Sequence, residues 1–446
     1  MRENDRPFAP VLHPGVLSSS PTVRPSRRIA LWVSLAAAGS LTVYSTDGYF
    51  SDGYGIKAKG RAGVSLAEAD DAMGGANNPA TTTWVSDRVD FGVDWFVPER
   101  SAQRTGPAAP LNGSVDSTRD NFFIPELAFK RSISPNLSLS LSLYGNGGMN
   151  TDYPAGQLNL GPGASGQNLL AGPGHLGVSL TQLLIAPTVG WKFASSQSIG
   201  LSPIIGYQRF KAYGLGAFAP LSQNPGALSD VGIAQSWGAG VRLGYFWEIT
   251  EKVALGAEYS SPVFSQRFNK YRGLFAGDGS FDIPQSGGVG LAWQTLPALR
   301  VGLDYKYIDY AGVDSVGNPS SNPGLLGQPH GPGFGWRSIS VVKVGADWKA
   351  GEHWTLRAGY SFNENPVDSK YVTFNILAPA VVQHHLTVGL TFEFGRHELS
   401  AAFMHAFANS VAGESRFVAL GLAPPGTTEE ISMSQNSFGL AYGFKF

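Results

Sequence analysis

The sequence predicts an all-β fold, namely a transmembrane antiparallel β-barrel of about 14 strands. Three observations predict this fold. Apolar side chains alternate with small or polar ones over segments of about ten residues, which is the length that a tilted strand needs to cross a bilayer. Short turns alternate with long loops along the chain, and tryptophans gather beside the short turns. Together these features are typical of a barrel whose apolar side faces lipid.

The first 45 residues have the composition of a secretory leader. An apolar run covers residues 29–44 and follows three arginines between residues 24 and 28. A positive region, an apolar region and then small residues are the parts of a secretory signal peptide. We therefore expect residues 1–45 to be a leader and signal peptide. Cleavage is expected at the A-x-A site of Ala36 and Ala38, or near Ser45 as the alternative.

The composition argues against a typical soluble domain, a helical membrane protein and a nucleic-acid-binding protein. Charged residues make up 15% of the chain, against about 25% in an average soluble domain. Beyond residue 45 no apolar run approaches the roughly 20 residues of a membrane-spanning helix. The net charge of -1 gives no case for nucleic-acid binding. With no cysteine in the chain, disulfides and thiol chemistry are excluded.

The segment 136–145 shows the alternation most clearly, with leucine at positions 137, 139, 141 and 143 and serine at the three positions between them. Because successive side chains of a strand point to opposite faces, the leucines are expected to face lipid and the serines a lumen. The expected strands cover residues 88–97, 121–133, 136–145, 179–194, 198–210, 236–249, 252–261, 282–294, 298–309, 338–349, 353–363, 382–394, 397–408 and 430–446.

Connections and aromatic residues support a closed barrel in the bacterial outer membrane. Barrels of that membrane have short periplasmic turns and long outer loops, with aromatic girdles at both interfaces. The chain ends on an alternating strand whose last residue is Phe446, a signal that the barrel-assembly machinery reads in outer-membrane proteins. The expected short turns are residues 134–136, 195–197, 250–252, 295–297, 350–352 and 395–396. The tryptophans beside them are Trp191, Trp247, Trp293, Trp348 and Trp354.

Residues 46–84 do not alternate and carry a more specific signal. Gly60 and Gly63 lie in KGRAGV, an acidic AEADDA follows at 67–72, and Asn78-Pro79-Ala80 precedes the first strand. With these motifs the chain resembles the FadL-type family of outer-membrane transporters for long-chain fatty acids and related hydrocarbons. The resemblance implies that residues 46–84 form a hatch inside a barrel of residues 85–446. An Asn-Pro pair also requires an extended residue 78, whose carboxamide is then available to bond its neighbours.

The resemblance also implies a function and a route. Family members capture hydrophobic ligands at outer loops, hold them in a lumen pocket gated by the hatch, and release them sideways into the bilayer. Long-chain fatty acids are the first expectation for the ligand, and aromatic or alkane hydrocarbons the alternative. In the family the sideways opening is a kink in the third strand. Here that strand ends in Gly145, Gly147 and Gly148, which supply the flexibility of a bulge or kink, although they could also just begin a long loop.

A fatty-acid carboxylate would need a cation in an otherwise apolar pocket. The apolar part is expected from outer loops such as residues 169–184 and 273–279. Inward-facing acids could pair with every inward cation, so a structural network in the lumen is the first expectation for any single one of them, and carboxylate binding is the alternative. The inward cations that could bind a carboxylate are Arg242, Arg300, Lys306, Lys343 and Arg357.

No catalytic site is expected, and neither is a metal or another cofactor. His384 and His385 begin a strand, so their side chains point to opposite faces and cannot grip one metal ion. A porin or a surface-binding barrel without specific transport is the alternative from another functional class. A porin requires a wide polar lumen, which a hatch of about 40 residues would fill. A monomer is expected by resemblance.

Overall fold

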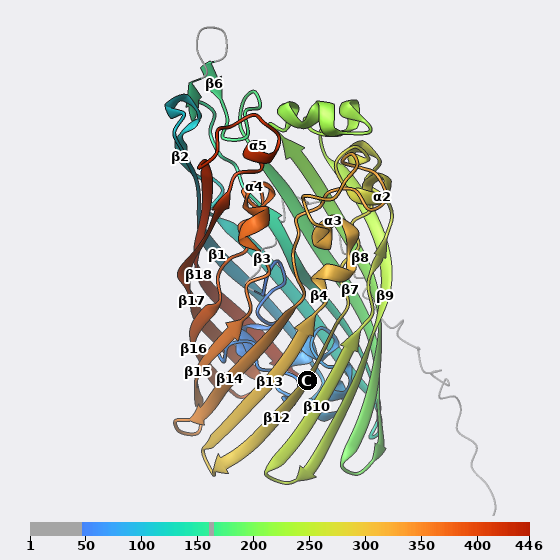
Figure 1. The fold of residues 1–446 in the computed structure, drawn as a ribbon. Coiled ribbons are helices and arrows are strands. Elements are labelled where there is room, and N and C mark those ends of the chain that lie inside the picture. Colours follow the sequence, from blue (N-terminus) through green and yellow to red (C-terminus); the bar gives the residue numbers. More distant parts are fainter. Residues whose placement is uncertain (1–46, 160–164) are drawn as a thin grey trace, which may run out of the picture. The chain divides into compact units, whose positions relative to one another are not determined.

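The computed structural model describes residues 47–159 and 165–446, and in them a closed β-barrel (Figure 1). Each long strand pairs in antiparallel fashion with its neighbours in the chain, and β1 pairs with β18 to complete the ring. The long strands are β1 (Arg88–Thr105), β3 (Phe122–Ser134), β4 (Leu137–Asn150), β7 (Gly177–Ala194), β8 (Gln197–Tyr213), β9 (Ala234–Thr250), β10 (Val253–Ser260), β12 (Ser286–Leu296), β13 (Leu299–Ile308), β14 (Ile339–Lys349), β15 (Trp354–Asn363), β16 (His384–Phe394), β17 (His397–Glu414) and β18 (Thr428–Lys445).

These 14 strands confirm the predicted barrel and its strand number. The largest difference is at the loop ends of β1 and β17, which continue to Thr105 and Glu414 where the sequence predicted ends near residues 97 and 408. Beyond the lipid-facing belt both faces of these strands are largely polar, so the alternation that marks a strand disappears while its hydrogen bonds continue. Two short strands extend the sheet, β2 (Gly113–Asp116) beside β1 and β11 (Phe264–Ser265) beside β9. A separate pair is formed by β5 (Leu158–Asn159) and β6 (Ser165–Gln167).

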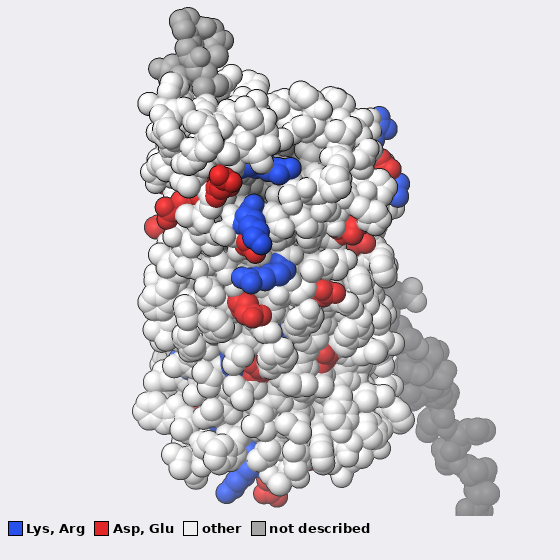
Figure 2. Space-filling view, viewed as in Figure 1, with Lys and Arg blue, Asp and Glu red and all other residues white. Residues whose placement is uncertain are grey.

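Alternation sorts the side chains as the sequence predicted. In β4, Leu139 and Leu141 are exposed on the outside of the barrel, whereas the serines between them are buried in the lumen. The tryptophans beside the tight turns also face outward, and Trp348 exposes 53% of its surface. Most of the face drawn in Figure 2 carries no charged side chain. A belt of this kind is stable only against lipid.

Helices are short and lie at the two ends of the lumen rather than in the wall (Figure 1). No helix in the described ranges is long and apolar enough to span a membrane. The expected signal peptide and its cleavage sites lie outside the described residues. The N-terminal elements are α1 (Ile56–Lys59), η1 (Ala72–Gly75) and η2 (Pro79–Trp84). The loop elements are η3 (Ala109–Leu111), η4 (Gly216–Leu221), η5 (Pro225–Ala227), η6 (Asn269–Tyr271), α2 (Ala276–Gly279), η7 (Tyr310–Gly312), α3 (Asp314–Gly317), η8 (Ser369–Tyr371), α4 (Val372–Asn375) and α5 (Arg416–Ala419).

Residues 47–84, called the N-terminal segment below, run through the part of the lumen nearest the tight turns (Figure 1). Their contacts reach strands from opposite parts of the ring, because α1 packs on β16 and β17 while η2 packs on β7, β8 and β9. Several wall glycines face this segment, and a Cβ on Gly200 would overlap the backbone of Pro79. The wall is therefore shaped to admit backbone at close range.

Candidate functional site

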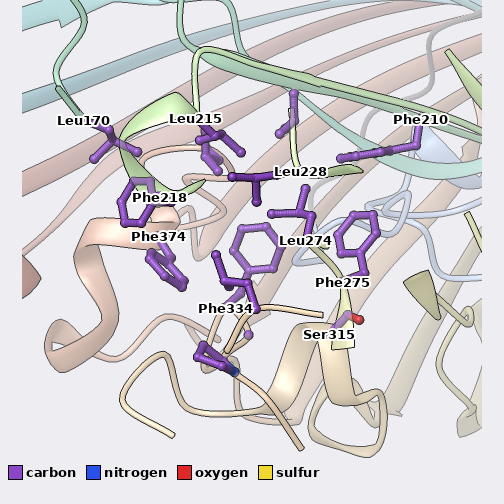
Figure 3. A pocket seen from close by; sticks show the side chains of 15 residues that line it. Leu170, Phe210, Leu215, Phe218, Leu228, Leu274, Phe275, Ser315, Phe334 and Phe374 are labelled. Carbon is purple, nitrogen blue, oxygen red and sulfur yellow. The ribbon is translucent and has the colours of Figure 1, made fainter. Parts of the chain in front are cut away.

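An apolar pocket lies among the long loops at the other end of the lumen (Figure 3). The space among its lining side chains measures about 530 Å³, part of which is open to solvent. Aromatic rings pack around it, with centroids 4.6 Å apart for Phe210 and Phe275 and 5.5 Å apart for Phe218 and Phe374. The residues that line it are Leu170, Val178, Phe210, Leu215, Phe218, Leu228, Leu274, Phe275, Ser315, Leu326, Pro332, Gly333, Phe334, Phe374 and Leu377.

Both loops in which the sequence placed an apolar pocket contribute to it. Leu170 and Val178 come from the first, and Leu274 and Phe275 from the second. The second loop is held by Tyr271, whose hydroxyl donates to the carbonyl of Gly232 at 2.6 Å and accepts the amide of Ala212 at 3.0 Å. Phe334 and Phe374 also line the pocket but are not predicted from the sequence, because irregular loop segments carry no period that indicates which side chains point inward.

The lining is free of charge. Among the described residues that form it, Ser315 is the one with a polar side chain. Its hydroxyl donates a 2.6 Å hydrogen bond to the carbonyl of Ser280 and is therefore already engaged within the protein. The side chains that line this pocket offer almost only hydrocarbon to a ligand, and burying a charge against them without a partner would cost several kcal/mol.

The lumen beside the tight turns has the opposite character. Lys343 binds two carboxylates of the N-terminal segment, at 2.8 Å from Asp47 and 2.8 Å from Asp52. Arg300 pairs with Glu68 at 2.7 Å in the same way. Burial raises the pKa of Asp47 to about 6, and the nearby Lys343 ammonium acts against this rise. These pairs fasten the segment to the wall.

The five cations proposed for a ligand carboxylate are all engaged in such contacts. Lys306 lies 3.9 Å from Glu258, and Arg357 lies 3.2 Å from Asp347. Arg242 donates to the carbonyls of Gly75 and Ala76 in the N-terminal segment, and to the hydroxyls of Tyr144 and Ser260. None of the five lines the apolar pocket. Arg242, Arg300 and Lys343 therefore hold the N-terminal segment directly, whereas Lys306 and Arg357 pair with acids of the barrel wall.

The residues predicted for the hatch lie at close contacts with the barrel wall. Asn78 is extended and fully buried, and its amide donates to the carbonyls of Leu66 at 2.7 Å and Tyr245 at 2.9 Å. Pro79 and Ala80 open η2, where the backbone amide of Ala80 is capped by the side chain of Asn78. The two remaining positions are glycines packed against backbone, Gly60 against Gly389, and Gly63, which has φ of 82°, against Asp52.

Next to the predicted kink the strand ladder of the wall is interrupted, and this interruption is called the window below. Between the described strands, pairing of β3 with β4 starts at Leu127 and Leu143, so residues 122–126 and 144–150 face each other without ladder bonds. On its other side, β4 shifts register against β7 between Gly145 and Gly147. Farther toward the loops, the segment before β3 and the segment after β4 are again hydrogen-bonded, because the amide of Thr118 donates to the carbonyl of Asp152 at 2.8 Å.

The N-terminal segment takes the place that β3 leaves vacant beside β4. Phe50 forms a bridge with Gly147, and the amide of Ser51 donates to the carbonyl of Asn146 at 2.9 Å. The amide of Gly148 donates to the carbonyl of Tyr49 at 3.1 Å. A side chain at position 147 would overlap that carbonyl, so glycine is required for this contact. The edge of β4 is thus turned inward and partly satisfied from the lumen.

The opposite edge of the window contains a signal that the sequence analysis passed over. Pro125 lies in the part of β3 that pairs with β1 but not with β4, and proline is confined to strand edges because it cannot donate to a ladder. One residue further, the carboxylate of Glu126 accepts the amides of Gly55 and Ile56 at 3.0 Å each. The N-terminal segment therefore contacts both edges of the window.

A closed barrel with a lipid-facing belt, a filled lumen and an apolar outer pocket defines an outer-membrane transport protein for hydrophobic small molecules. The family model described as "Outer membrane protein transport protein (OMPP1/FadL/TodX)" matches residues 45–446. The chain belongs to this family, which is one of transport proteins and not of enzymes. Its place is accordingly the bacterial outer membrane.

Solved structures share the fold. The toluene transporter TodX of Pseudomonas putida superposes with a TM-score of 0.64 at 18% identity, covering 90% of this chain and 100% of that one. A FadL homologue of Pseudomonas aeruginosa gives 0.64 at 15% identity, with 90% and 100% covered. The toluene transporter TbuX of Ralstonia pickettii gives 0.60 at 17% identity, with 89% and 99% covered. No curated protein matches the chain.

Proposed function

We propose that this protein takes up uncharged hydrophobic compounds, of which monoaromatic hydrocarbons are the first candidates. The observation that carries the proposal is the uncharged lining of the outer pocket. Aromatic and aliphatic side chains there gain about 25 cal/mol for each Å² of apolar ligand surface removed from water. Two of the structural relatives are described as toluene transporters, which agrees with this ligand class.

Long-chain fatty acids, the first expectation from the sequence, are the second candidate. They fit the apolar lining with their chains, but the carboxylate would need a cation at the pocket. The five inward cations are engaged elsewhere, and Lys343 and Arg300 each have a carboxylate of the protein at 2.8 Å or less. A fatty acid would have to displace these pairs or leave its headgroup among the outer loops.

The N-terminal segment acts in this proposal as the hatch of the barrel. It fills the lumen between the apolar pocket and the tight turns, and its buried ion pairs hold it in place. On its other side a polar space of about 1250 Å³, part of which is open to solvent, is lined by six basic and six acidic side chains. An apolar ligand gains nothing by moving into such a cavity, because the charges there are better solvated by water.

Release then proceeds sideways through the window between β3 and β4. The bilayer is the favourable destination for an apolar ligand, at about 0.8 kcal/mol for each buried CH₂ group. The missing ladder bonds beside Tyr144–Asn150 and the register shift at Gly145 and Gly147 support this exit. Gly147 and Gly148 let the chain of β4 turn inward at the opening.

Uptake of radiolabelled toluene and oleate tests the ligand class in cells that produce the protein and lack other transporters of this kind. Wild-type protein is expected to raise toluene uptake several-fold over cells without it, and to leave oleate uptake unchanged. Leu228→Asp, which places a charge in the pocket, is expected to abolish the gain. Leu422→Asp is the matched control, because Leu422 lies on an exposed loop. Uptake of oleate but not of toluene would favour the fatty-acid candidate.

A further inference from the structure

A short segment forms the partition between the outer pocket and the window. Leu377 lines the apolar pocket, whereas the next three residues line a second cavity of about 300 Å³. That cavity also contacts β4 at Gly148 and Asn150, beside the window. Residues 376–380, called the strap below, therefore separate the place where a ligand would be held from the place where it would leave.

The chemistry of the strap suits a part that an apolar ligand can pass. Its sequence, ILAPA, has no charged or polar side chain, and all of its residues are buried. It has neither helical nor ladder structure beyond α4, and the amide of Ala380 bonds only locally, to the carbonyl of Ala378 at 2.8 Å. Displacing the strap would therefore uncover apolar surface for the ligand without separating any ion pair.

The two ends of the strap are fixed by side-chain amides, of which that of Asn375 is fully buried. On the α4 side, Asn375 donates to the carbonyls of Phe334 at 2.8 Å and Tyr371 at 2.9 Å. On the β16 side, Asn409 donates to the carbonyl of Val381 at 2.8 Å. A segment held at both ends and apolar between them can bow at its middle while its ends remain in place.

One side-chain hydrogen bond joins the middle of the strap to the barrel wall, within the part of the chain that the structure describes. The hydroxyl of Thr151 donates to the carbonyl of Leu377 at 2.9 Å. Thr151 follows β4 directly and is fully buried. Its backbone amide donates to the carbonyl of Val178, a residue of the pocket, at 3.0 Å. Thr151 is thus placed where pocket, strap and window edge meet.

We propose that the strap is an internal gate between the outer pocket and the window, and that Thr151 is the positioning residue that latches it closed. The structure shows the closed state of this gate, in which Leu377 lines the apolar pocket and Ala378 lines the second cavity beside the window. Opening breaks the bond between Thr151 and Leu377 and joins the two cavities. This gate rests on the proposed function, since it controls the transfer of the ligand taken up there.

A cross-link across the latch tests the gate, because the natural chain has no cysteine. Thr151→Cys with Ala378→Cys, bridged by dibromobimane in the purified full-length protein, ties the strap to β4, and Ala378 faces the second cavity without lining the apolar pocket. The probe is radiolabelled toluene, and two quantities are measured: its binding to immobilised protein by scintillation proximity, and its transfer from the protein into liposomes. The bridged protein is expected to bind toluene with unchanged affinity and to lose transfer at least ten-fold. The two single-cysteine variants, treated with the same reagent, are the controls.

The latch is tested separately by Thr151→Val, which keeps the shape and removes the hydroxyl, and by Thr151→Ser, which keeps the hydroxyl. The valine variant is expected to transfer toluene several-fold faster with unchanged binding, and the serine variant to behave as the wild type. Transfer by the bridged protein at the rate of the unbridged one would overturn the gate while leaving the proposed function intact. Wild-type protein that binds neither toluene nor oleate would overturn both.

Discussion

The half of the lumen beside the tight turns and the half beside the long loops contain opposite chemistry. The first is filled by the N-terminal segment and laced with buried ion pairs, such as Lys343 with Asp47 at 2.8 Å. The second holds the apolar pocket, where the one polar side chain is already hydrogen-bonded. The contrast teaches that charge in this protein holds the segment in place, while under the proposed function the ligand is recognised by shape and apolar contact.

The largest expected effect is the loss of a central ion pair. Lys343→Met leaves Asp47 and Asp52 buried without their cation, and removing one partner of a buried pair costs about 3–5 kcal/mol. We expect a loss of this size in the free energy of unfolding by urea, measured on protein folded in detergent micelles. The control is Lys349→Met, at an exposed position beside a tight turn. Equal effects of the two changes would contradict a special role for charge in the inner half.

The second prediction concerns the apolar half of the lumen, into which a substitution introduces a charge. Leu228 is buried in the pocket wall, and Leu228→Asp places a carboxylate against an apolar ligand. We expect toluene affinity to fall about 100-fold, equivalent to about 2.8 kcal/mol. Scintillation proximity with radiolabelled toluene measures the change. A retained affinity would show that the ligand binds elsewhere.

The contact between the N-terminal segment and β4 depends on Gly147. Gly147→Ala forces a methyl group against the carbonyl of Tyr49, and strain of this kind costs about 1–3 kcal/mol. We expect the N-terminal segment to separate from β4, which faster hydrogen exchange of the Ser51 and Gly148 amides would report. Gly226→Ala is the control, because a side chain there meets open space. Unchanged exchange would mean that the segment is held by its ion pairs alone.

The smallest effect is expected where the ion pairs reach the polar cavity. The side chain of Arg300 is 29% exposed, so solvent screens its pair with Glu68. Arg300→Gln should therefore lower the free energy of unfolding by about 1 kcal/mol or less. The same urea measurement compares it with Lys343→Met. A loss as large as that of the buried pair would show that depth in the lumen does not set the contribution of a charge.

Prediction from sequence worked where one residue type repeats at a fixed spacing. The strand number, the inward position of the five cations and the extended backbone of Asn78 all follow from period two or from a local motif. It failed where long-range contacts decide the outcome. The pairing of Phe50 with Gly147 joins segments almost 100 residues apart, and no local sequence pattern near either residue predicts it. Proline at position 125 could have indicated the free edge of β3, but only if its neighbour in the sheet had been known.

By itself, the sequence determined that the chain is a membrane barrel. It also determined which segments form strands and which of their faces meet lipid, because the alternation of side chains is a local pattern that depends only on neighbouring residues. Only the tertiary structure decided which cations are available and where the apolar pocket lies. The pairing of Arg242, Lys306 and Arg357 with acids of the protein depends on side chains brought together from distant strands. The pocket likewise draws on several loops, from Leu170 to Leu377, whose meeting is set by closure of the barrel and by no local pattern.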